Sequence, residues 1–412
     1  MQFKKILLFG LCGLAPVINN GGLVLAVILL SKVIGLSTNE LGQANLIFLI
    51  TAFVMGLGGF GTSEAFYKFA QTKPDSIYPA IIRNLKISFF LLVVTLITNF
   101  RFNWLNLNSG LEYLLFGVLF LSFNYTFVCS LFLSLGQKIS YSLFQLVHPI
   151  LLLMSLYFLQ SLKSYSVPVL VLAALIISLI LPLLIMSVIL YRQGKLNFAN
   201  SKVDSEILDF SHSNIIILFS IMVIMQTDGL FLVNLLPDGL TQNGVFKSIA
   251  QVAKLAMAMG VFVSIPLAPM LAAWFREKNF AKIKKTYWLA NLAMGTVSLI
   301  LVVITSIWHF SIIQLLFTQK EIQSSSFLLP ILLAFFCLSG MQYLNHYLWQ
   351  MAGKIQLVWQ VTLLQAIIFV VGMVYFVPQG LMFTAIFMLI QQFLVWIGWL
   401  LYFNFNFQKN IL

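Results

Sequence analysis

The chain has 412 residues, of which 61% are hydrophobic and only 8% are charged. Because soluble globular domains carry about 25% charged residues, this composition excludes an ordinary soluble protein and indicates a helical protein with many membrane spans. The net charge of +12 does not indicate a nucleic-acid partner, because most lysines and arginines lie in short gaps between long apolar runs.

The apolar runs predict twelve membrane-spanning helices, each close to the ~20 residues that cross a bilayer. Lysines and arginines are about four times as numerous in the loops on one side of the predicted membrane as in those on the other. The positive-inside rule places the basic side, together with both termini, in the cytoplasm. In chain order the predicted spans are Leu7–Leu30, Leu41–Tyr67, Ile81–Phe100, Leu111–Leu135, Ser140–Leu159, Val167–Tyr191, Asn214–Leu236, Gly244–Phe275, Tyr287–Phe310, Phe327–Trp349, Val358–Val377 and Leu381–Phe403.

The first two spans contain polar residues that suggest contacts with a substrate or a gate. Asn19 and Asn20 lie midway along span one, where amides can hydrogen-bond either sugar hydroxyls or a facing helix. Glu64 and Lys68 are four residues apart at the inner end of span two. That spacing is typical of an interfacial ion pair on one helix face, and a cytoplasmic gate is the alternative.

Two of the histidines within predicted spans lie next to residues that explain them without a function. His148 precedes Pro149 in span five, and His346 lies near Gln342 and Asn345 in span ten. Either imidazole could carry a proton, but a single buried histidine beside such residues more often packs or kinks a helix. We therefore interpret both groups as packing.

Asp228 lies in the middle of the apolar span seven, where a charge is expensive and indicates a function. Burial raises the pKa of a carboxylate and a nearby cation lowers it, so Asp228 could couple transport to a proton or sodium ion. The alternative is a fixed ion pair between Asp228 and Lys254 that only orients two helices.

Span eight carries Lys247, Gln251 and Lys254, followed by Ala258, at spacings of four, three and four. These spacings place the side chains on one helix face, where two ammonium groups would form a cationic wall. Lysine binds phosphate as a point charge, so the wall suggests an anionic head group as substrate. Alternatively, Lys247 extends to the membrane surface and only Lys254 is internal.

The two halves of the chain share an order of features that predicts an internal repeat. The turn at Gly136-Gln137-Lys138 between spans four and five corresponds to Gly353-Lys354 between spans ten and eleven. Span two also ends in a glycine-rich segment, and span eight ends in a segment with two prolines. We expect a lobe at residues 1–191, an inter-lobe loop at 192–213 and a second lobe at 214–412, arranged as parallel repeats.

These features resemble the multidrug/oligosaccharidyl-lipid/polysaccharide flippase superfamily, abbreviated MOP. The resemblance comes from the twelve-span layout, the aspartate in span seven, and the residues Gly56–Gly61, Gly244-Val245-Phe246, Pro266–Pro269 and Gly353-Lys354. Within this superfamily, the length of the chain and its excess of basic over acidic residues most resemble those of the bacterial O-antigen flippases. The resemblance implies an all-α fold of two six-helix lobes around a central cavity. It also implies transfer of an undecaprenyl-pyrophosphate-linked oligosaccharide from the cytoplasmic to the periplasmic leaflet.

The expected function is therefore a flippase of the bacterial inner membrane. Its partners would be the lipid-linked glycan, membrane lipids and, in a larger assembly, a polysaccharide polymerase and a chain-length regulator. A multidrug or cation antiporter of the same superfamily is the main alternative. We rank a membrane scaffold and a polymerase lower. No P-loop, zinc-ligand spacing or Ser/His/Asp set indicates an enzyme, a metal or a cofactor beyond a coupled ion.

Overall fold

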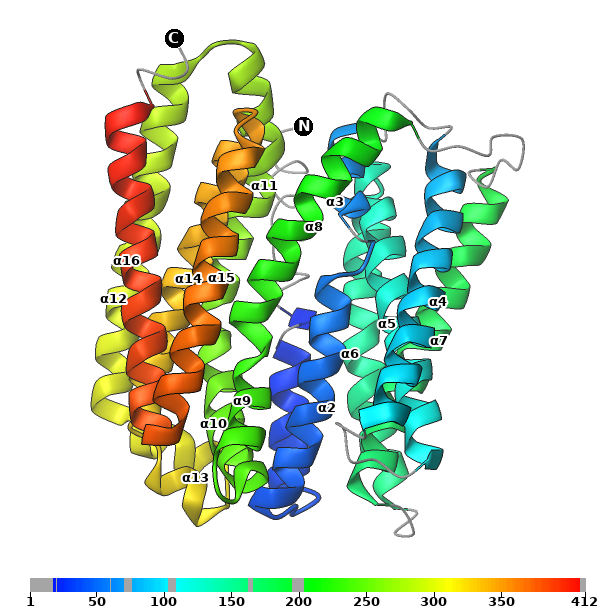
Figure 1. The fold of residues 1–412 in the computed structure, drawn as a ribbon, viewed down its shortest axis with the longest axis vertical. Coiled ribbons are helices and arrows are strands. Elements are labelled where there is room, and N and C mark those ends of the chain that lie inside the picture. Colours follow the sequence, from blue (N-terminus) through cyan, green and yellow to red (C-terminus); the bar gives the residue numbers. More distant parts are fainter. Residues whose placement is uncertain are drawn as a thin grey trace. The chain divides into compact units, whose positions relative to one another are not determined.

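The computed structural model of the chain describes residues 18–19, 21–59, 61–69, 76–102, 109–161, 166–194 and 204–407. Its secondary structure within these ranges is entirely helical (Figure 1). The expected all-α, multi-span class is therefore confirmed for the described part of the chain.

The chain divides into two compact units. Unit 1 comprises Met1–Leu46 and Thr227–Leu412, and unit 2 comprises Ile47–Gln226. The chain leaves unit 1 in the middle of one helix, α2 (Thr38–Gly56), and returns to it at a helix break after Gln226. The predicted lobes, which divide at the 192–213 loop, stay a prediction. Residues 205–213 of that loop are already helical.

Unit 2 is a helical bundle around α5. Here α5 packs against α3, α4, α6 and α7, while α3 also packs against α8. Besides the second part of α2, its helices are α3 (Thr62–Phe69), α4 (Ile77–Phe102), α5 (Ser109–Ser134), α6 (Lys138–Gln160), α7 (Val167–Arg192) and α8 (Ser205–Gln226).

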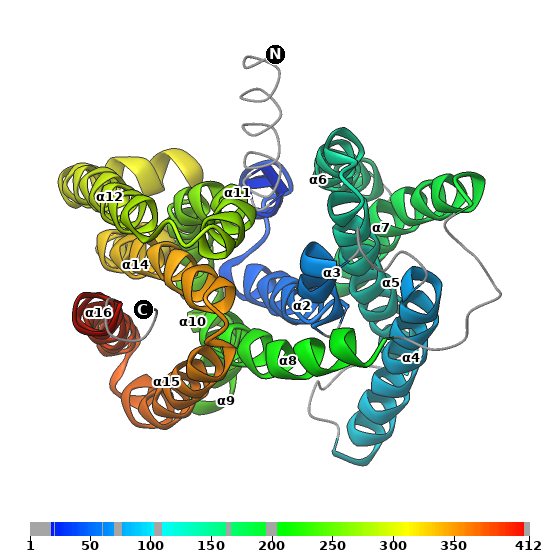
Figure 2. The same cartoon turned by 90° about the horizontal axis from the view of Figure 1, so that it is seen from above.

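Unit 1 is organised around α14, which packs against α10, α11, α12, α15 and α16 (Figures 1 and 2). It also contains the helix Gly21–Lys32 and the first part of α2. The remaining helices are α9 (Asp228–Leu235), α10 (Gly239–Lys254), α11 (Met257–Arg276), α12 (Phe280–Leu316), α13 (Lys320–Ser324), α14 (Leu328–Met351), α15 (Ile355–Phe376), the short 3₁₀ helix η2 (Val377–Gln379) and α16 (Leu381–Asn406).

Nine helical segments among the described residues are long and apolar enough to cross a membrane, and they coincide with predicted spans four to twelve. The predicted number of twelve is not confirmed. Most of span one lies outside the described residues. Span two is divided into α2 and α3 by Gly59 and Gly61, whose positive φ angles end the helix. Span three coincides with α4, which is not among the nine.

Local sequence signals explain where several helices begin. The α2 helix starts with a capping box, in which the Ser37 N–H donates to Glu40 Oε2 at 2.8 Å and the Glu40 N–H donates to Ser37 Oγ at 3.3 Å. The Asn279 carboxamide oxygen accepts from the Lys282 N–H at 3.3 Å and caps α12. Such caps satisfy backbone donors that have no partner within the helix.

The two turns that suggested an internal repeat have the same backbone structure. Gly136 after α5 has φ +77°, and Gly353 after α14 has φ +79°. In each case the next N–H donates to a carbonyl five residues back, Gln137 to Phe132 at 2.9 Å and Lys354 to Trp349 at 2.8 Å. Both turns are therefore Schellman motifs that need glycine in the left-handed region.

Glycines also allow close helix crossings at equivalent places in both units. A Cβ at Gly58 would lie 2.7 Å from Thr126 Cβ and 2.9 Å from the Phe123 carbonyl oxygen of α5. A Cβ at Gly260 in α11 would collide with the backbone of Gly340 in α14. The glycines near the ends of spans two and eight thus serve packing, as expected for small residues between membrane helices.

We predict that Gly260→Ala lowers the stability of the folded chain by about 1–3 kcal/mol, because the added methyl group forces α11 and α14 apart. The apparent Tm of the purified protein in detergent measures this effect. Gly398→Ala on α16 is the matched control, since its Cβ would meet no atom within 4 Å. Equal Tm values for the two variants would contradict the close crossing.

Candidate functional site

Asp228 and Lys254 lie at short interruptions of the helices in spans seven and eight, whereas Lys247 lies within α10. The α8 helix ends at Gln226, and α9 begins at Asp228 after Thr227, which has φ −85° and ψ −9°. The α10 helix ends at Lys254, and α11 begins at Met257. The predicted span eight still corresponds to one membrane-length segment, Gly239–Ser264, because Leu255 and Ala256 keep right-handed helical dihedral angles. Hydropathy averaged over a span cannot reveal a break whose flanking residues are themselves mostly apolar.

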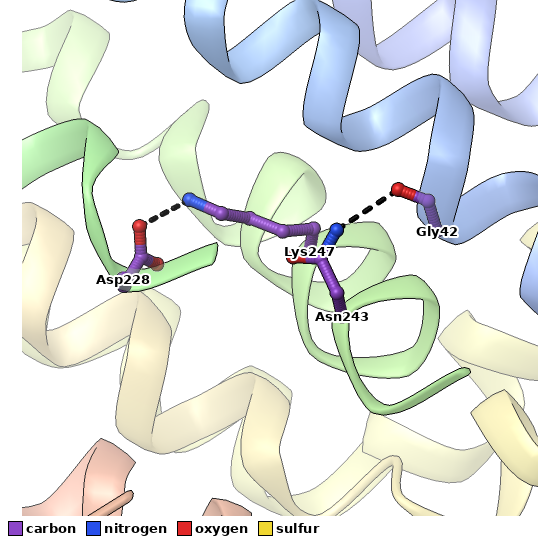
Figure 3. Close-up of polar contacts among 4 residues, drawn as sticks. All are labelled: Gly42, Asp228, Asn243 and Lys247. Carbon is purple, nitrogen blue, oxygen red and sulfur yellow. Dashed lines mark hydrogen bonds and ion pairs between the residues drawn. The ribbon is translucent and has the colours of Figure 1, made fainter. Parts of the chain in front are cut away.

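Asp228 and Lys247 form a buried ion pair between α9 and α10 (Figure 3). Only 1% of Asp228 and 5% of Lys247 is exposed. A charge buried to this degree must be paired, because removing it from water costs several kcal/mol. From the sequence, the alternative to ion coupling was a fixed ion pair between Asp228 and Lys254. In the structure the ion pair of Asp228 is with Lys247. Lys247 therefore does not extend to the membrane surface.

The helix breaks stabilise both ends of this charged group. Asp228 is the first residue of α9, where the positive end of the helix dipole favours a carboxylate. Lys254 is the last residue of α10, where the negative end favours an ammonium. Each interaction contributes about 0.3–1 kcal/mol. Discontinuous helices thus place opposite charges where the backbone supports them, as in many transporters.

The structure brings together most of the face predicted on span eight. Lys247 and Gln251 are buried, and Lys254 is half-buried at the end of the same helix. Lys254 interacts electrostatically with both Lys247 and Asp228. Ala258 lies beyond the break and belongs to α11. We call Asp228, Lys247 and Lys254 the charged group of unit 1. It contains two ammonium groups and one carboxylate.

The first part of α2 holds α10 in place beside this group. A Cβ at Gly42 would collide with the Leu240 carbonyl oxygen, so only glycine allows this approach. The Asn243 side chain donates to the Gly42 carbonyl oxygen at 2.9 Å, one turn before Lys247 (Figure 3). Asn45 donates to Ser248 Oγ at 3.3 Å. These contacts are not predicted from the sequence, although the polar residues Asn243 and Asn45 within apolar runs are a usable signal.

The remaining predicted site residues are only partly described. Asn19 is half-buried near the start of the first described helix, and Asn20 lies outside the described residues. The backbones of Glu64 and Lys68 belong to α3, but their side chains lie outside the described part. The sugar contact at Asn19 and Asn20 and the cytoplasmic gate at Glu64 and Lys68 therefore stay predictions.

A second, uncharged polar cluster lies within unit 1. Gln342 of α14 donates to Gln365 of α15 at 2.8 Å, and Gln365 donates to Gln392 of α16 at 2.8 Å. Gln392 donates back to Gln342, so the three amides form a closed ring. His346 lies 3.2 Å from Gln342, Nε2 to Nε2. The sequence analysis noted Gln342 and His346 but missed Gln365 and Gln392.

Comparison with known proteins identifies the fold. No protein-family model matches the chain, and no curated protein matches it. A Vibrio cholerae MATE transporter is 13% identical with TM-score 0.72, covering 100% of this chain and 99% of its own. A multidrug resistance MATE family transporter of the MOP superfamily, in an outward-facing conformation, is 15% identical with TM-score 0.72, covering 97% and 95%.

A third match is a MOP superfamily transporter from Pyrococcus furiosus, 14% identical with TM-score 0.74, covering 97% of this chain and 95% of its own. It is described as having a binding pocket of reversed polarity that suggests a different function. At these identities the likeness shows the fold alone. The chain has the fold of these transporters, and its nine described helices of sufficient length and hydropathy fit a multi-pass membrane protein.

We predict that Asp228→Asn or Lys247→Met alone destabilises the chain by about 3–5 kcal/mol, because each leaves a buried charge without its partner. The double variant Asp228→Asn/Lys247→Met should recover most of this loss. Apparent Tm and the yield of monodisperse protein measure both effects. As the matched control, Asp228→Asn/Lys254→Met should not recover. Equal recovery by the two double variants would mean that Lys247 is not the partner.

Proposed function

We propose that this chain is a flippase that moves an amphipathic substrate with an anionic head group across a bacterial cytoplasmic membrane. The substrate class is a polyprenyl-pyrophosphate-linked oligosaccharide, whose lipid tail stays in the bilayer while the head group crosses. The fold supports a transporter, because the solved structures that share it are transporters. The charge of the unit 1 group supports the choice of substrate.

The composition of the charged group, with two ammonium groups and one carboxylate, is the observation that carries the proposal. Lys247 is matched by Asp228, and Lys254 adds a second ammonium within electrostatic reach of both. A pyrophosphate is a suitable ligand for such a group, since lysine binds phosphate oxygens as a point charge. Half-burial of Lys254 at the end of α10 leaves part of its side chain accessible. Gln251, one turn earlier, would add an amide.

The comparison with the Pyrococcus furiosus transporter supports this reasoning in a general way. That protein shares the fold and is described as having a pocket of reversed polarity that suggests a different function. Charge in the pocket, rather than the fold, would then distinguish substrates within one architecture. The basic group of this chain fits an anionic substrate better than a cationic drug.

Energy for transport would come from an ion gradient or from the gradient of the substrate, because the sequence has no nucleotide-binding motif. Asp228 is the candidate coupling residue. Its carboxylate would exchange its contact with Lys247 for a proton or sodium ion during the cycle. A released Lys247 would then offer its ammonium group to the head-group site, which links ion binding to substrate binding.

A multidrug or cation antiporter is the second candidate function. The matches to multidrug resistance transporters favour it directly. A drug cation, however, needs an acidic partner, and the one carboxylate in the charged group, Asp228, is already neutralised by Lys247. Binding therefore discriminates between the two candidates. A polysaccharide polymerase and a chain-length regulator would be partners only if the chain is a flippase.

We predict that undecaprenyl-pyrophosphate-linked oligosaccharide raises the apparent Tm of the purified chain, because a ligand that binds only the folded state stabilises it. Lipophilic cations should give no comparable rise. Undecaprenyl phosphate and the free oligosaccharide serve as partial ligands that separate the contributions of lipid, phosphate and sugar. Stabilisation by the cations alone would favour the multidrug antiporter and contradict the flippase.

We also predict that Lys254→Gln reduces translocation of a fluorescent lipid-linked oligosaccharide in proteoliposomes by about tenfold or more, since a hydrogen bond to a charged group contributes about 1.5–3 kcal/mol. Lys354→Gln is the matched control, because Lys354 is exposed in the turn between α14 and α15. Both variants should insert and fold like the unaltered chain. Normal transport by Lys254→Gln would remove this residue from the site.

A further inference from the structure

Exposed positive charge is concentrated at the connection between α11 and α12. Five basic residues lie within ten positions of the chain, and all five are exposed: Arg276, Lys278, Lys282, Lys284 and Lys285. We call these residues the basic patch. Glu277 is the one acidic residue in the same segment, so five positive charges against one negative leave a net charge of +4. Such a density of exposed charge attracts an anionic partner.

The turn between the two helices holds the basic patch together. Lys278 has φ +55°, and the Asn279 N–H donates to the Trp274 carbonyl oxygen at 2.9 Å, five residues back. The left-handed residues after α5, α7 and α14 are all glycines, namely Gly136, Gly194 and Gly353. A lysine in this conformation is strained, whereas a glycine is not. The lysine at this position therefore indicates a function for its charged side chain.

Aromatic contacts fix the basic patch against the rest of unit 1. Lys282 Nζ lies 4.6 Å from the centroid of the Trp274 ring in α11, within the range of a cation–π interaction. The Tyr287 ring in the second turn of α12 stacks on Phe403 of α16, with the centroids 3.8 Å apart. Figure 1 shows the α11–α12 connection at the same end of unit 1 as the C-terminal end of α16. The cations are thus carried by packed helix ends.

Two tryptophans of α12 place the basic patch at the membrane surface. Trp288 and Trp308 are both exposed, and they are separated by 20 residues. At a rise of 1.5 Å per residue they lie about 30 Å apart, which matches the hydrocarbon core of a bilayer. Indole rings favour the two interfaces of that core. Lys284 and Lys285 lie one turn outside Trp288, about 5–6 Å beyond it, in the head-group layer.

The surface of α12 next to the basic patch is apolar and exposed. Leu289 and Leu292 are both exposed, and only 11% of the residues in the most apolar segment of α12 are buried. Lys285, Trp288 and Leu292 recur at spacings of three and four, so they follow one another along one helix face. This face offers a cation, an indole ring and an alkyl side chain in that order. A partner that is anionic at one end and apolar at the other matches it.

We propose that the basic patch and the adjoining face of α12 bind an anionic phospholipid from the leaflet on the predicted cytoplasmic side. The lipid phosphate would lie among the ammonium groups, because lysine binds phosphate as a point charge. An acyl chain would lie along Leu289 and Leu292. A soluble anion would match the charges but not the apolar face. The site lies at the opposite end of α11 from Lys254, and it does not depend on the proposed transport function.

The test measures the apparent Tm of the full chain in detergent with increasing phosphatidylglycerol, and with phosphatidylcholine as the zwitterionic reference. A saturable rise with phosphatidylglycerol is expected, because a ligand that binds the folded state stabilises it. The variant Lys282→Gln/Lys284→Gln/Lys285→Gln should raise the half-saturating concentration of phosphatidylglycerol by roughly tenfold or more, since each basic residue near an anionic lipid strengthens binding several-fold.

The matched control is Lys138→Gln/Arg192→Gln/Lys354→Gln, which removes the same charge from exposed positions in other loops on the same predicted side. It should leave the half-saturating concentration unchanged. Lys254→Gln should also leave it unchanged, which separates this site from the proposed head-group site. Equal effects of the two triple variants would mean diffuse attraction and would overturn the basic patch as a site. No rise above phosphatidylcholine, or an equal rise with soluble glycerol 3-phosphate, would overturn the lipid as its ligand.

Lys278→Gly is a variant in which relief of strain and loss of lipid binding have opposite signs. Glycine removes the strain of the left-handed backbone, so the Tm in phosphatidylcholine should rise. Loss of one cation should raise the half-saturating concentration of phosphatidylglycerol by about fivefold. A higher Tm in phosphatidylcholine with an unchanged half-saturating concentration would contradict the role of this lysine in lipid binding.

Discussion

The need to keep a buried carboxylate beside a buried ammonium governs much of unit 1. Neither Asp228 nor Lys247 could remain charged among apolar helices without the other, because desolvation of an unpaired ion costs several kcal/mol. Their contact requires α9 and α10 to approach at a fixed register. The helix breaks at Thr227 and after Lys254 direct helix dipoles toward the same charges. The charged group and the broken helices therefore explain one another.

Close backbone packing provides the precision that this contact needs. Gly42 and Gly244 let α2 and α10 approach so closely that a Cβ on either residue would collide with the backbone of the other helix. Gly260 and Gly340 do the same for α11 and α14, and Gly58 does so in unit 2. Since lipid tails are as apolar as leucine, membrane helices gain little from burying apolar surface, and tight packing replaces that contribution. Small residues thus allow close helix crossings in both units.

Unit 1 contains two polar clusters of different chemistry. The charged group has two ammoniums and one carboxylate, which suits an anionic head group together with a coupling ion. The second cluster is the neutral glutamine ring, which joins α14, α15 and α16. Such a ring stabilises its helices only because every amide in it is satisfied. Solved transporters with this fold include one described as having reversed pocket polarity, so side chains rather than architecture would determine the substrate.

Local patterns in the sequence were sufficient for the helical class and for the nine spans from four to twelve, because hydropathy depends only on residues close together in the chain. They also identified Asp228, Lys247 and Lys254 as unusual, since a charge in an apolar run is visible without a structure. The tertiary structure alone decided that Asp228 forms its ion pair with Lys247, and that short interruptions fall at Thr227 and after Lys254. It alone revealed the ring of Gln342, Gln365 and Gln392, because hydrogen bonds between helices depend on their register and rotation, which no local pattern encodes.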